Sequence, residues 1–262
     1  MAKQPFSDSI AVKKKYGQHF LRNEAIPYRI IDAVTLGPDS SVFEIGCGDG
    51  VLTKAILEQK IARLWVYEID PEWAAYVQKK LPDPRLTIHL ENILDVDFAP
   101  MVPYKPWVLL ANLPYQITFP ILFRLVENRD LLAEGVIMVQ EEVAQKIVKT
   151  SGRGYGFSSL FFQYHFEWTM MEKVPPGAFF PPPKVNSRLL HFRPRKNLKE
   201  IPQAELFWKF IKLIFHQPRR TIKNNLSQTH YDLSRIDAQL QAKRAQQLSM
   251  NDLLAIWELI RV

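Results

Sequence analysis

The chain has 262 residues, 47% of them hydrophobic, which is enough for one large core and a smaller second unit. Its single cysteine, Cys47, excludes an internal disulfide and favours a reducing compartment. No apolar run approaches the length of a membrane span, which argues against a membrane protein. We therefore expect a protein of the cytoplasm that has no membrane partner.

The positive charge is concentrated at the C-terminal end. Residues 1–192 carry 21 basic and 21 acidic side chains, whereas residues 193–262 carry 13 and 6 and so hold the whole net charge of +7. A neutral part followed by a basic part indicates that the second part faces a polyanion such as RNA or DNA. A basic surface that only keeps the protein in solution is the alternative interpretation.

Short apolar runs alternate with helical patterns from Ser41 onward. The expected strands are 41–45, 64–67, 86–90, 107–111 and 135–140, and the expected helices are 50–59, 71–81, 119–128 and 141–149. This alternation predicts an α/β fold of the Rossmann-like type, with a mostly parallel, doubly wound sheet. Two more expected strands, 167–174 and 188–193, have no helix between them, so this end of the sheet is expected to be antiparallel.

Only helical patterns follow Pro194. They cover residues 203–215, 219–227 and 250–262. We therefore expect two domains, an α/β domain over residues 1–194 and a small, basic, all-α domain over residues 195–262.

A glycine-rich loop follows the first expected strand and opens a helix. Gly46, Gly48 and Gly50 have the spacing G-x-G-x-G, which allows a tight turn and a close approach of backbone to a ligand. The third glycine of a dinucleotide fingerprint and the lysine of a P-loop are both missing, and Glu44 would repel a pyrophosphate. The loop therefore disfavours NAD and ATP and suits a ligand with a cationic amino-acid end, such as S-adenosylmethionine.

Polar residues also follow the next two strands. Glu68 ends the second strand about twenty residues after the glycines, where a carboxylate accepts the hydroxyls of a ribose. Asp70 precedes Pro71 at a helix start, so helix capping is its better interpretation. Asn92 follows the third strand, where it is either an adenine contact or a turn residue. These strand ends are expected to converge on one crevice.

The four residues Asn112-Leu113-Pro114-Tyr115 follow the fourth expected strand. The side-chain oxygen of Asn112 and the backbone carbonyl beside Pro114 can each accept one hydrogen of an exocyclic amine. When both hydrogens are accepted, the nitrogen lone pair stays available to attack an electrophile, and Tyr115 can stack on the ring that carries the amine. Taken alone, the four residues are explained equally well as a helix-entry turn.

Seven motifs, spread over nearly the whole chain, resemble those of the KsgA-type small-subunit rRNA adenine dimethyltransferases. They lie at residues 16–21, 44–53, 68–71, 112–115, 152–159, 178–187 and 215–224. In combination they are highly specific. The resemblance implies a class I methyltransferase domain over residues 1–194 and a helical RNA- or ribosome-binding domain over residues 195–262.

The resemblance also implies roles for individual residues. S-adenosylmethionine is the implied cofactor, with contacts at His19, Leu21, Gly46, Gly48, Glu68, Asn92 and Asn112. The residues implied in methyl transfer are Asn112, Pro114, Tyr115 and Phe179. In this mechanism Asn112 and the Pro114 carbonyl orient the adenine amine, and the rings of Tyr115 and Phe179 enclose the base. Core packing is the alternative role for Phe179.

The chain departs from the family pattern at three positions. His19 stands where Asn is usual, Asn23 where an acid is common, and Asn92 where Asp is usual. Asn92 keeps an acceptor but loses the charge, which predicts a weaker hold on the adenine of the cofactor. None of the three is a residue of methyl transfer.

Basic residues outside the crevice are candidates for RNA phosphate contacts, which fix register without reading bases. Arg219, Arg220 and Lys223 are expected on one helix, with the last two on the same face. Arg153 lies in a loop between glycines, and the lysines at 13–15 form either a basic arm or a plain tail. For each of these residues, a solvated surface side chain is the alternative interpretation.

The resemblance implies dimethylation of two adjacent adenosines in small-subunit (16S) rRNA, within an assembling subunit, by a monomer that needs no metal. A large-subunit rRNA methyltransferase of the antibiotic-resistance kind is a second possibility, which the C-terminal part and residues 181–187 disfavour. A third is an RNA- or DNA-binding factor without catalytic activity. The glycine loop, Glu68 and Asn112 argue against it, because a protein that only binds would not need them.

Overall fold

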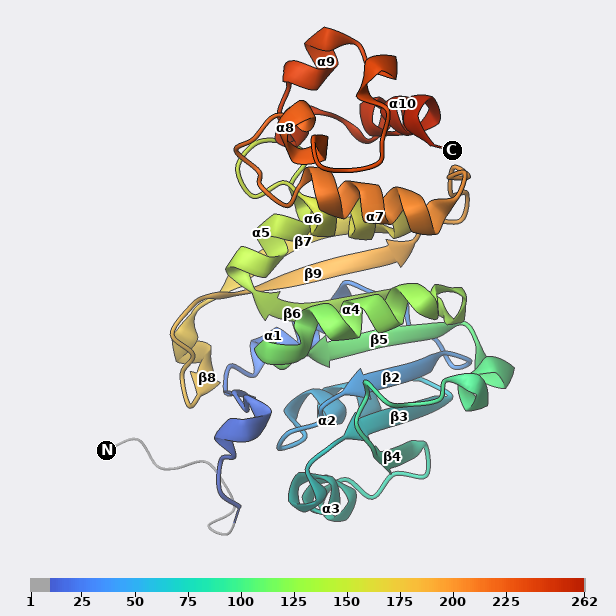
Figure 1. Cartoon of the computed structure of the whole chain (residues 1–262). Helices are drawn as coiled ribbons and strands as arrows, with labels where there is room; N and C mark the ends of the chain where they lie inside the picture. Colours follow the sequence, from blue (N-terminus) through green and yellow to red (C-terminus); the bar gives the residue numbers. More distant parts are fainter. Residues whose placement is uncertain (1–9, 262) are drawn as a thin grey trace. The chain divides into compact units, whose positions relative to one another are not determined.

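The computed structural model describes residues 10–261, and these form two compact units (Figure 1). The first unit comprises the chain up to Ala144 together with Glu167–Pro194, and the second comprises Gln145–Phe166 together with the chain from Arg195 onward. The predicted boundary at residue 194 therefore differs from the division in the structure, because residues 145–166 cluster with the C-terminal part. Tyr155 and Leu160 belong to the same buried cluster as the helices that follow residue 195.

The first unit is built on a seven-stranded sheet with the order β4-β3-β2-β5-β6-β9-β7. Its strands are β2 (Ser41–Ile45), β3 (Arg63–Glu68), β4 (Leu86–Leu90), β5 (Trp107–Asn112), β6 (Leu132–Gln140), β7 (Phe166–Val174) and β9 (Ser187–Pro194). The pairs among β2 to β6 are parallel, and β9 is antiparallel to β6. The predicted Rossmann-like, mostly parallel sheet with an antiparallel end is thus confirmed.

The chain order of the strands reverses at β2, which pairs with β3 on one side and with β5 on the other. In sheets of this kind, ligands bind at the carboxyl ends of the strands beside such a reversal. All five residues of β2 and the first five of β5 are buried, so both strands lie inside the core. Strands buried on both faces are expected to be continuous apolar runs, as they are here apart from Ser41 and Glu44 of β2.

Five α-helices begin in the part of the first unit that the structure describes. They are α1 (Ala25–Asp32), α2 (Val51–Leu57), α3 (Pro71–Lys80), α4 (Thr118–Glu127) and α5 (Glu141–Val148), the last of which continues into the second unit. Asp70 begins α3 by accepting a hydrogen bond from the backbone N–H of Glu72, and Pro71 occupies the first turn. The predicted capping role of Asp70 is therefore confirmed.

A separate two-stranded sheet pairs segments that are far apart in sequence. It joins β1 (Phe20–Leu21) to β8 (Phe179–Phe180) in antiparallel register, with Phe20 opposite Phe180 and Leu21 opposite Phe179. The backbone N–H of Arg22 extends the pairing by donating to the carbonyl oxygen of Ala178 over 2.7 Å. Neither segment shows a strand pattern in the sequence, because each is only two residues long.

The second unit is helical. It contains α6 (Phe157–His165), α7 (Ala204–Ile214), α8 (Ile222–Leu226), α9 (Ala238–Ala242) and α10 (Met250–Ile260). Fully buried aromatic side chains, among them Phe207, Phe210 and Trp257, form its core. None of the helices found between residues 10 and 261 is long and apolar enough to cross a membrane.

One predicted helix is shorter than expected. The pattern over residues 219–227 forms a helix only from Ile222 to Leu226. Thr221 is the N-cap residue of this helix, because its side chain accepts a hydrogen bond from the backbone N–H of Asn224. Arg219 and Arg220 therefore lie in the turn before the helix, and the prediction that they share a helix with Lys223 is wrong.

The close packing around Gly135 of β6 predicts how a substitution there affects stability. A Cβ atom at this position would lie 2.6 Å from the carbonyl oxygen of Leu109 and 2.7 Å from the ring of Phe192. We expect Gly135→Ala to lower the free energy of unfolding by about 1–3 kcal/mol, because the neighbouring strands must move apart. Denaturant titration measures this value.

Gly177→Ala is the matched control, because a Cβ atom there would meet nothing within 4 Å. We expect this change to alter the free energy of unfolding by less than about 1 kcal/mol. Equal effects of the two substitutions would contradict the close packing described at Gly135.

Candidate active site

A cleft of about 360 Å³ lies at the carboxyl ends of β2, β3, β4 and β5. It is lined by residues 15–21, 44–49, 67–69, 91–94 and 112–117, together with Ile30, Val51 and Leu52. The structure thus brings together all the residues predicted to bind the cofactor, and also Pro114 and Tyr115. Phe179 is the one member of the predicted set in the first unit that does not line the cleft.

The glycine loop leaves β2 through left-handed backbone conformations. Gly46 has φ = 75° and Gly48 has φ = 52°, values that favour glycine over other residues. A Cβ atom would meet nothing within 4 Å at Gly46, but would lie 3.0 Å from the ring of Phe20 at Gly48. The loop can therefore present bare backbone to a ligand in the cleft.

Glu68, at the end of β3, is buried and held by its neighbours. Its Oε1 accepts a hydrogen bond from the backbone N–H of Asp70 (2.8 Å), and its Oε2 accepts one from Gly48 N–H (3.3 Å). The thiol of Cys47 also lies within 3.5 Å of Oε2. Burial raises the pKa of Glu68, and the two backbone N–H donors oppose this shift. Oε1 accepts only one of these bonds, so it retains capacity for a ribose hydroxyl.

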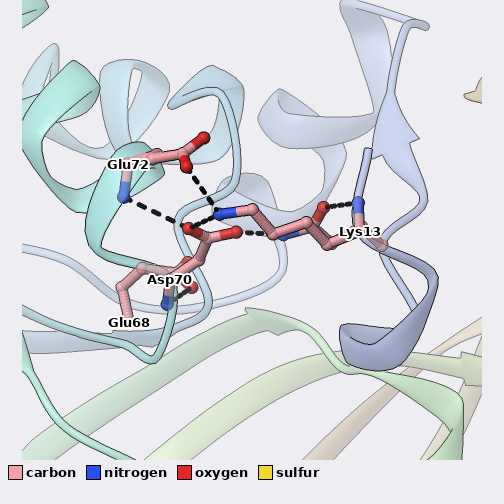
Figure 2. A network of polar contacts seen from close by, with 5 residues as sticks. Lys13, Glu68, Asp70 and Glu72 are labelled. Carbon is pink, nitrogen blue, oxygen red and sulfur yellow. Dashed lines mark hydrogen bonds and ion pairs between the residues drawn. The ribbon is translucent and has the colours of Figure 1, made fainter. Parts of the chain in front are cut away.

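Lys13 forms ion pairs with acidic residues at the start of α3 (Figure 2). Its Nζ lies 2.6 Å from Asp70 Oδ1 and 3.2 Å from Glu72 Oε1, while the side-chain amide of Gln18 donates to Asp70 Oδ2 over 3.0 Å. Burial alone would raise the pKa of Asp70, but the hydrogen bonds from Lys13 and Gln18 bring it below its usual value. Lys13 is therefore neither a free basic arm nor part of a plain tail.

Asn112, the last residue of β5, is oriented by the N-terminal segment. Its Nδ2 donates a hydrogen bond to the backbone carbonyl oxygen of His19 over 3.0 Å. Because the nitrogen is used in this way, the amide oxygen is left to accept a hydrogen bond from a ligand. This is the orientation that the recognition of an amine requires.

The carbonyl predicted to accept the second amine hydrogen is already engaged. Pro114 O accepts hydrogen bonds from the backbone N–H of Ile117 and from the hydroxyl of Thr118, both at 3.2 Å. These two donors occupy both lone pairs of the oxygen. The neighbouring carbonyl of Leu113 accepts no hydrogen bond from the part of the chain that the structure describes, so it replaces Pro114 as the candidate acceptor.

Tyr115 lies just before α4, and both its ring and its hydroxyl contact other side chains. The hydroxyl is 2.6 Å from Ser187 Oγ, and the ring stacks on the imidazole of His19 with centroids 5.5 Å apart. Phe179, by contrast, is only 4% exposed and packs in the core beside Leu21. In this conformation of the chain, the ring of Phe179 is therefore not in the predicted position for stacking on a target base.

Asn92 uses both ends of its amide within its own turn. Its Oδ1 accepts from the backbone N–H of Leu94 over 3.2 Å, and its Nδ2 donates to Asp95 over 2.7 Å. These contacts agree with the interpretation of Asn92 as a turn residue. Only the second lone pair of Oδ1 is left for an adenine amine. Residues 10–261 contain no group of three or more His, Cys, Asp or Glu side chains that could hold a metal ion.

The predicted RNA-binding residues all belong to the second unit. Arg153, Arg219, Arg220 and Lys223 are exposed. The loop of Arg153 is tied to this unit by a hydrogen bond from the backbone N–H of Gly152 to Gln246 O (3.1 Å).

Two further exposed basic residues of the second unit, Lys243 and Arg244, were not predicted from the sequence. Lys243 accepts a backbone hydrogen bond from Ile222, and Arg244 pairs with Thr221 in an isolated antiparallel bridge. Both side chains are exposed and lie beside α8. Their signal in the sequence is an adjacent pair of basic residues in the basic C-terminal part, but only the backbone contacts show that they lie beside the segment that contains Arg220.

Glu44 of β2 is buried beneath the glycine loop and is 1% exposed. Burial raises its pKa to about 8, although a hydrogen bond from the Thr53 hydroxyl (2.7 Å) acts in the opposite direction. The carboxyl group is therefore mostly protonated at pH 7. The negative charge that the sequence assigns to Glu44, and with it the predicted repulsion of a pyrophosphate, is largely absent.

The strand order and the glycine loop define a Rossmann-like fold, and solved structures of methyltransferases share this fold. A dimethyladenosine transferase from Plasmodium falciparum has a TM-score of 0.79 at 22% identity, covering 92% of this chain and 96% of that one. The 23S rRNA methyltransferase ErmE has a TM-score of 0.73 at 25% identity, covering 93% and 100%.

The family follows from the sequence comparisons. Residues 10–260 match the family model of the ribosomal RNA adenine dimethylases. The chain is 36% identical over 253 residues to Ribosomal RNA small subunit methyltransferase A of Chlorobium phaeobacteroides, covering 96% of this chain and 92% of that protein. The protein of the same name from Syntrophotalea carbinolica is 34% identical over 257 residues, covering 95% and 97%. The chain belongs to the ribosomal RNA adenine dimethylase family.

The burial of Glu44 predicts how stability depends on pH. The pKa is about 8 in the folded chain and 4.5 in an ordinary carboxyl, so the folded state binds the proton more tightly than the unfolded state between these values. Stability contributed by this group is therefore present below pH 4.5 and is lost as the pH rises toward 8. We expect Glu44→Gln to remove this loss.

The measurement is the free energy of unfolding of wild type and variant from pH 5 to pH 8. We expect the variant to gain up to about 4 kcal/mol relative to wild type across this range, because one pKa unit corresponds to about 1.4 kcal/mol. A constant difference between the two proteins at all pH values would show that Glu44 is ionised throughout.

Proposed function

We propose that this protein transfers methyl groups from S-adenosylmethionine to the exocyclic amines of two adjacent adenosines in small-subunit (16S) rRNA. The proposed substrate is an assembling subunit in the cytoplasm, and the proposed enzyme acts as a monomer without a metal. The observation that carries the proposal is the hydrogen bond from Asn112 Nδ2 to His19 O, which leaves the amide oxygen free to accept an adenine amine. The names of the small-subunit relatives support the choice of RNA.

The cleft has the features that S-adenosylmethionine requires. The glycine loop offers backbone without side chains, and Glu68 keeps an acceptor for the ribose hydroxyls. When bound, this cofactor supplies an electrophilic methyl group on a sulfonium centre. The protein then needs no strong base to start the reaction and contributes mainly by aligning the amine with the methyl group.

Two acceptors would align the adenine amine. Asn112 Oδ1 would take one hydrogen and the carbonyl oxygen of Leu113 the other, since the Pro114 carbonyl is engaged. An amine that donates both hydrogens in this way directs its lone pair away from the two acceptors. A transfer would break the S–CH3 bond of the cofactor, leave a neutral thioether and release one proton of the amine to water. The methylated amine would retain one hydrogen and a lone pair, so either acceptor could orient it for a second transfer.

The target base must leave its stack to reach the cleft, because an adenine within a duplex cannot present its amine there. Tyr115 provides a ring on which the base can stack, an interaction worth about 1–3 kcal/mol per base. We keep Phe179 as a proposed second ring only for a conformation in which residues 178–187 have moved, since it is buried here.

The test is the transfer of labelled methyl groups to immature small subunits, mature small subunits and large-subunit rRNA. Dimethyladenosine that appears only in immature small subunits would support the proposal. Label in large-subunit rRNA would favour the second candidate function, for which the similarity to ErmE is the supporting observation. Tight RNA binding without any label would favour a factor that only binds.

Asn112→Ala is expected to lower kcat for methyl transfer by about 100-fold, because the amine loses the acceptor that aligns it. The measurement is single-turnover transfer to immature small subunits, with cofactor affinity determined separately by calorimetry. Asn128→Ala is the control, since the side chain of Asn128 donates to Arg124 O at the end of α4 and does not line the cleft. Equal activities of the Asn112 variant and the wild type would remove Asn112 from the mechanism.

The exposed basic residues of the second unit are proposed to contact RNA phosphates. We expect Arg220→Glu with Lys223→Glu to weaken RNA binding and to reduce the slope of log affinity against log salt by about 1–2. The matched control reverses two exposed lysines of the first unit, Lys60 and Lys79. If both double variants bind equally well at every salt concentration, the proposed phosphate contacts are wrong.

A further inference from the structure

The side chain of His19 lines the cleft, and the contacts that the structure gives it lead to the residues around the target base. Its imidazole stacks on Tyr115, with ring centroids 5.5 Å apart and an angle of 28° between the planes. Its Nδ1 lies 2.8 Å from the carbonyl oxygen of Pro181. A carbonyl only accepts, so Nδ1 carries the hydrogen and donates it.

The backbone of His19 takes part in the same arrangement. Its carbonyl oxygen accepts the hydrogen bond from Asn112 that orients the amide. His19 therefore touches both residues that the proposed function assigns to the target adenine, Asn112 through its backbone and Tyr115 through its ring.

The position of His19 is determined by the small sheet beside it. The next two residues form β1, which pairs with β8, and Arg22 continues the pairing to Ala178. This antiparallel register brings the imidazole of His19 to the carbonyl of Pro181, the residue that follows β8. The imidazole of His19 is therefore held by the paired backbone of β1 and by the hydrogen bond of its Nδ1, and a ring held in this way can support a neighbouring ring.

Tyr115 needs such support because it projects from a single turn of helix that follows β5. Its hydroxyl is held by Ser187 Oγ at 2.6 Å, which anchors the tip of the ring but not the plane. The imidazole of His19 lies against one face of the ring, with the centroids 5.5 Å apart. One face of Tyr115 is thereby occupied, and the opposite face is the one on which a base would stack.

We infer that His19 is a positioning residue for the target adenine, which holds the ring of Tyr115 in the plane required for stacking. The inference rests on the proposed function and deepens it. It assigns the imidazole to the base, whereas the family resemblance places this position among the cofactor contacts.

The test separates the base from the cofactor. His19→Ala is expected to lower kcat/KM for immature small subunits about three- to tenfold, the range expected for one aromatic pair. The affinity for S-adenosylmethionine, measured by calorimetry, should stay within about twofold of the wild-type value. His19→Phe keeps a ring at this position and should restore most of the lost activity, whereas His19→Asn should not.

A double-mutant cycle with Tyr115→Leu tests whether His19 acts through Tyr115. In that background, we expect His19→Ala to change kcat/KM by less than about twofold, because the ring that it supports is gone. A general loss of folding would instead reduce activity by the same factor in both backgrounds, and thermal unfolding of each variant monitors this directly.

Three results would overturn the inference. They are an unchanged kcat/KM in His19→Ala, a loss confined to cofactor affinity, and a gain in activity, which would mean that the imidazole occupies the place of the base. Wild-type protein that transfers no methyl group to any RNA would instead overturn the proposed function, and this inference with it.

Discussion

The parallel pairing of β2 with β3 on one side and β5 on the other is the constraint on which the candidate active site depends. Because both pairs are parallel, the strands end at the same edge of the sheet, and the chain connections leave a crevice between them. In the sequence, the glycine loop, Glu68 and Asn112 are separate features, each at the end of a different strand. A shift of β2 by one residue would move Glu44 to the other face of the sheet, away from the hydroxyl of Thr53 that donates to its carboxyl group.

The segment from Lys13 to Arg22 completes this crevice without belonging to the main sheet. One end is held by the ion pairs of Lys13 with Asp70 and Glu72, and the other by the pairing of β1 with β8. Between these attachments, Gln18 and His19 face the cleft. The segment thus connects the residues that would hold the cofactor to those that would hold the base, so the two halves of the site share one piece of backbone.

The second unit contains the exposed basic residues that we propose to contact RNA. Its exposed basic side chains come from three separate stretches, represented by Arg153, Arg220 and Arg244, which its own backbone hydrogen bonds bring into one compact unit. Contacts of such residues with phosphates position an RNA without reading its bases. Under the proposed function, selection of the two adjacent adenosines would then depend on how the RNA is presented to the cleft.

The elements with long and regular patterns could be predicted from the amino acids alone. The strands of the parallel sheet, the glycine loop and the acid at residue 68 could all be predicted, because period and spacing are local properties of the chain. Four features are seen only in the folded chain: the unit that contains residues 145–166, the partner strand of β1, the engaged carbonyl of Pro114 and the burial of Phe179. Each of these depends on partners distant in the sequence or on the exact course of a turn, and neither leaves a periodic signal in the amino acids themselves.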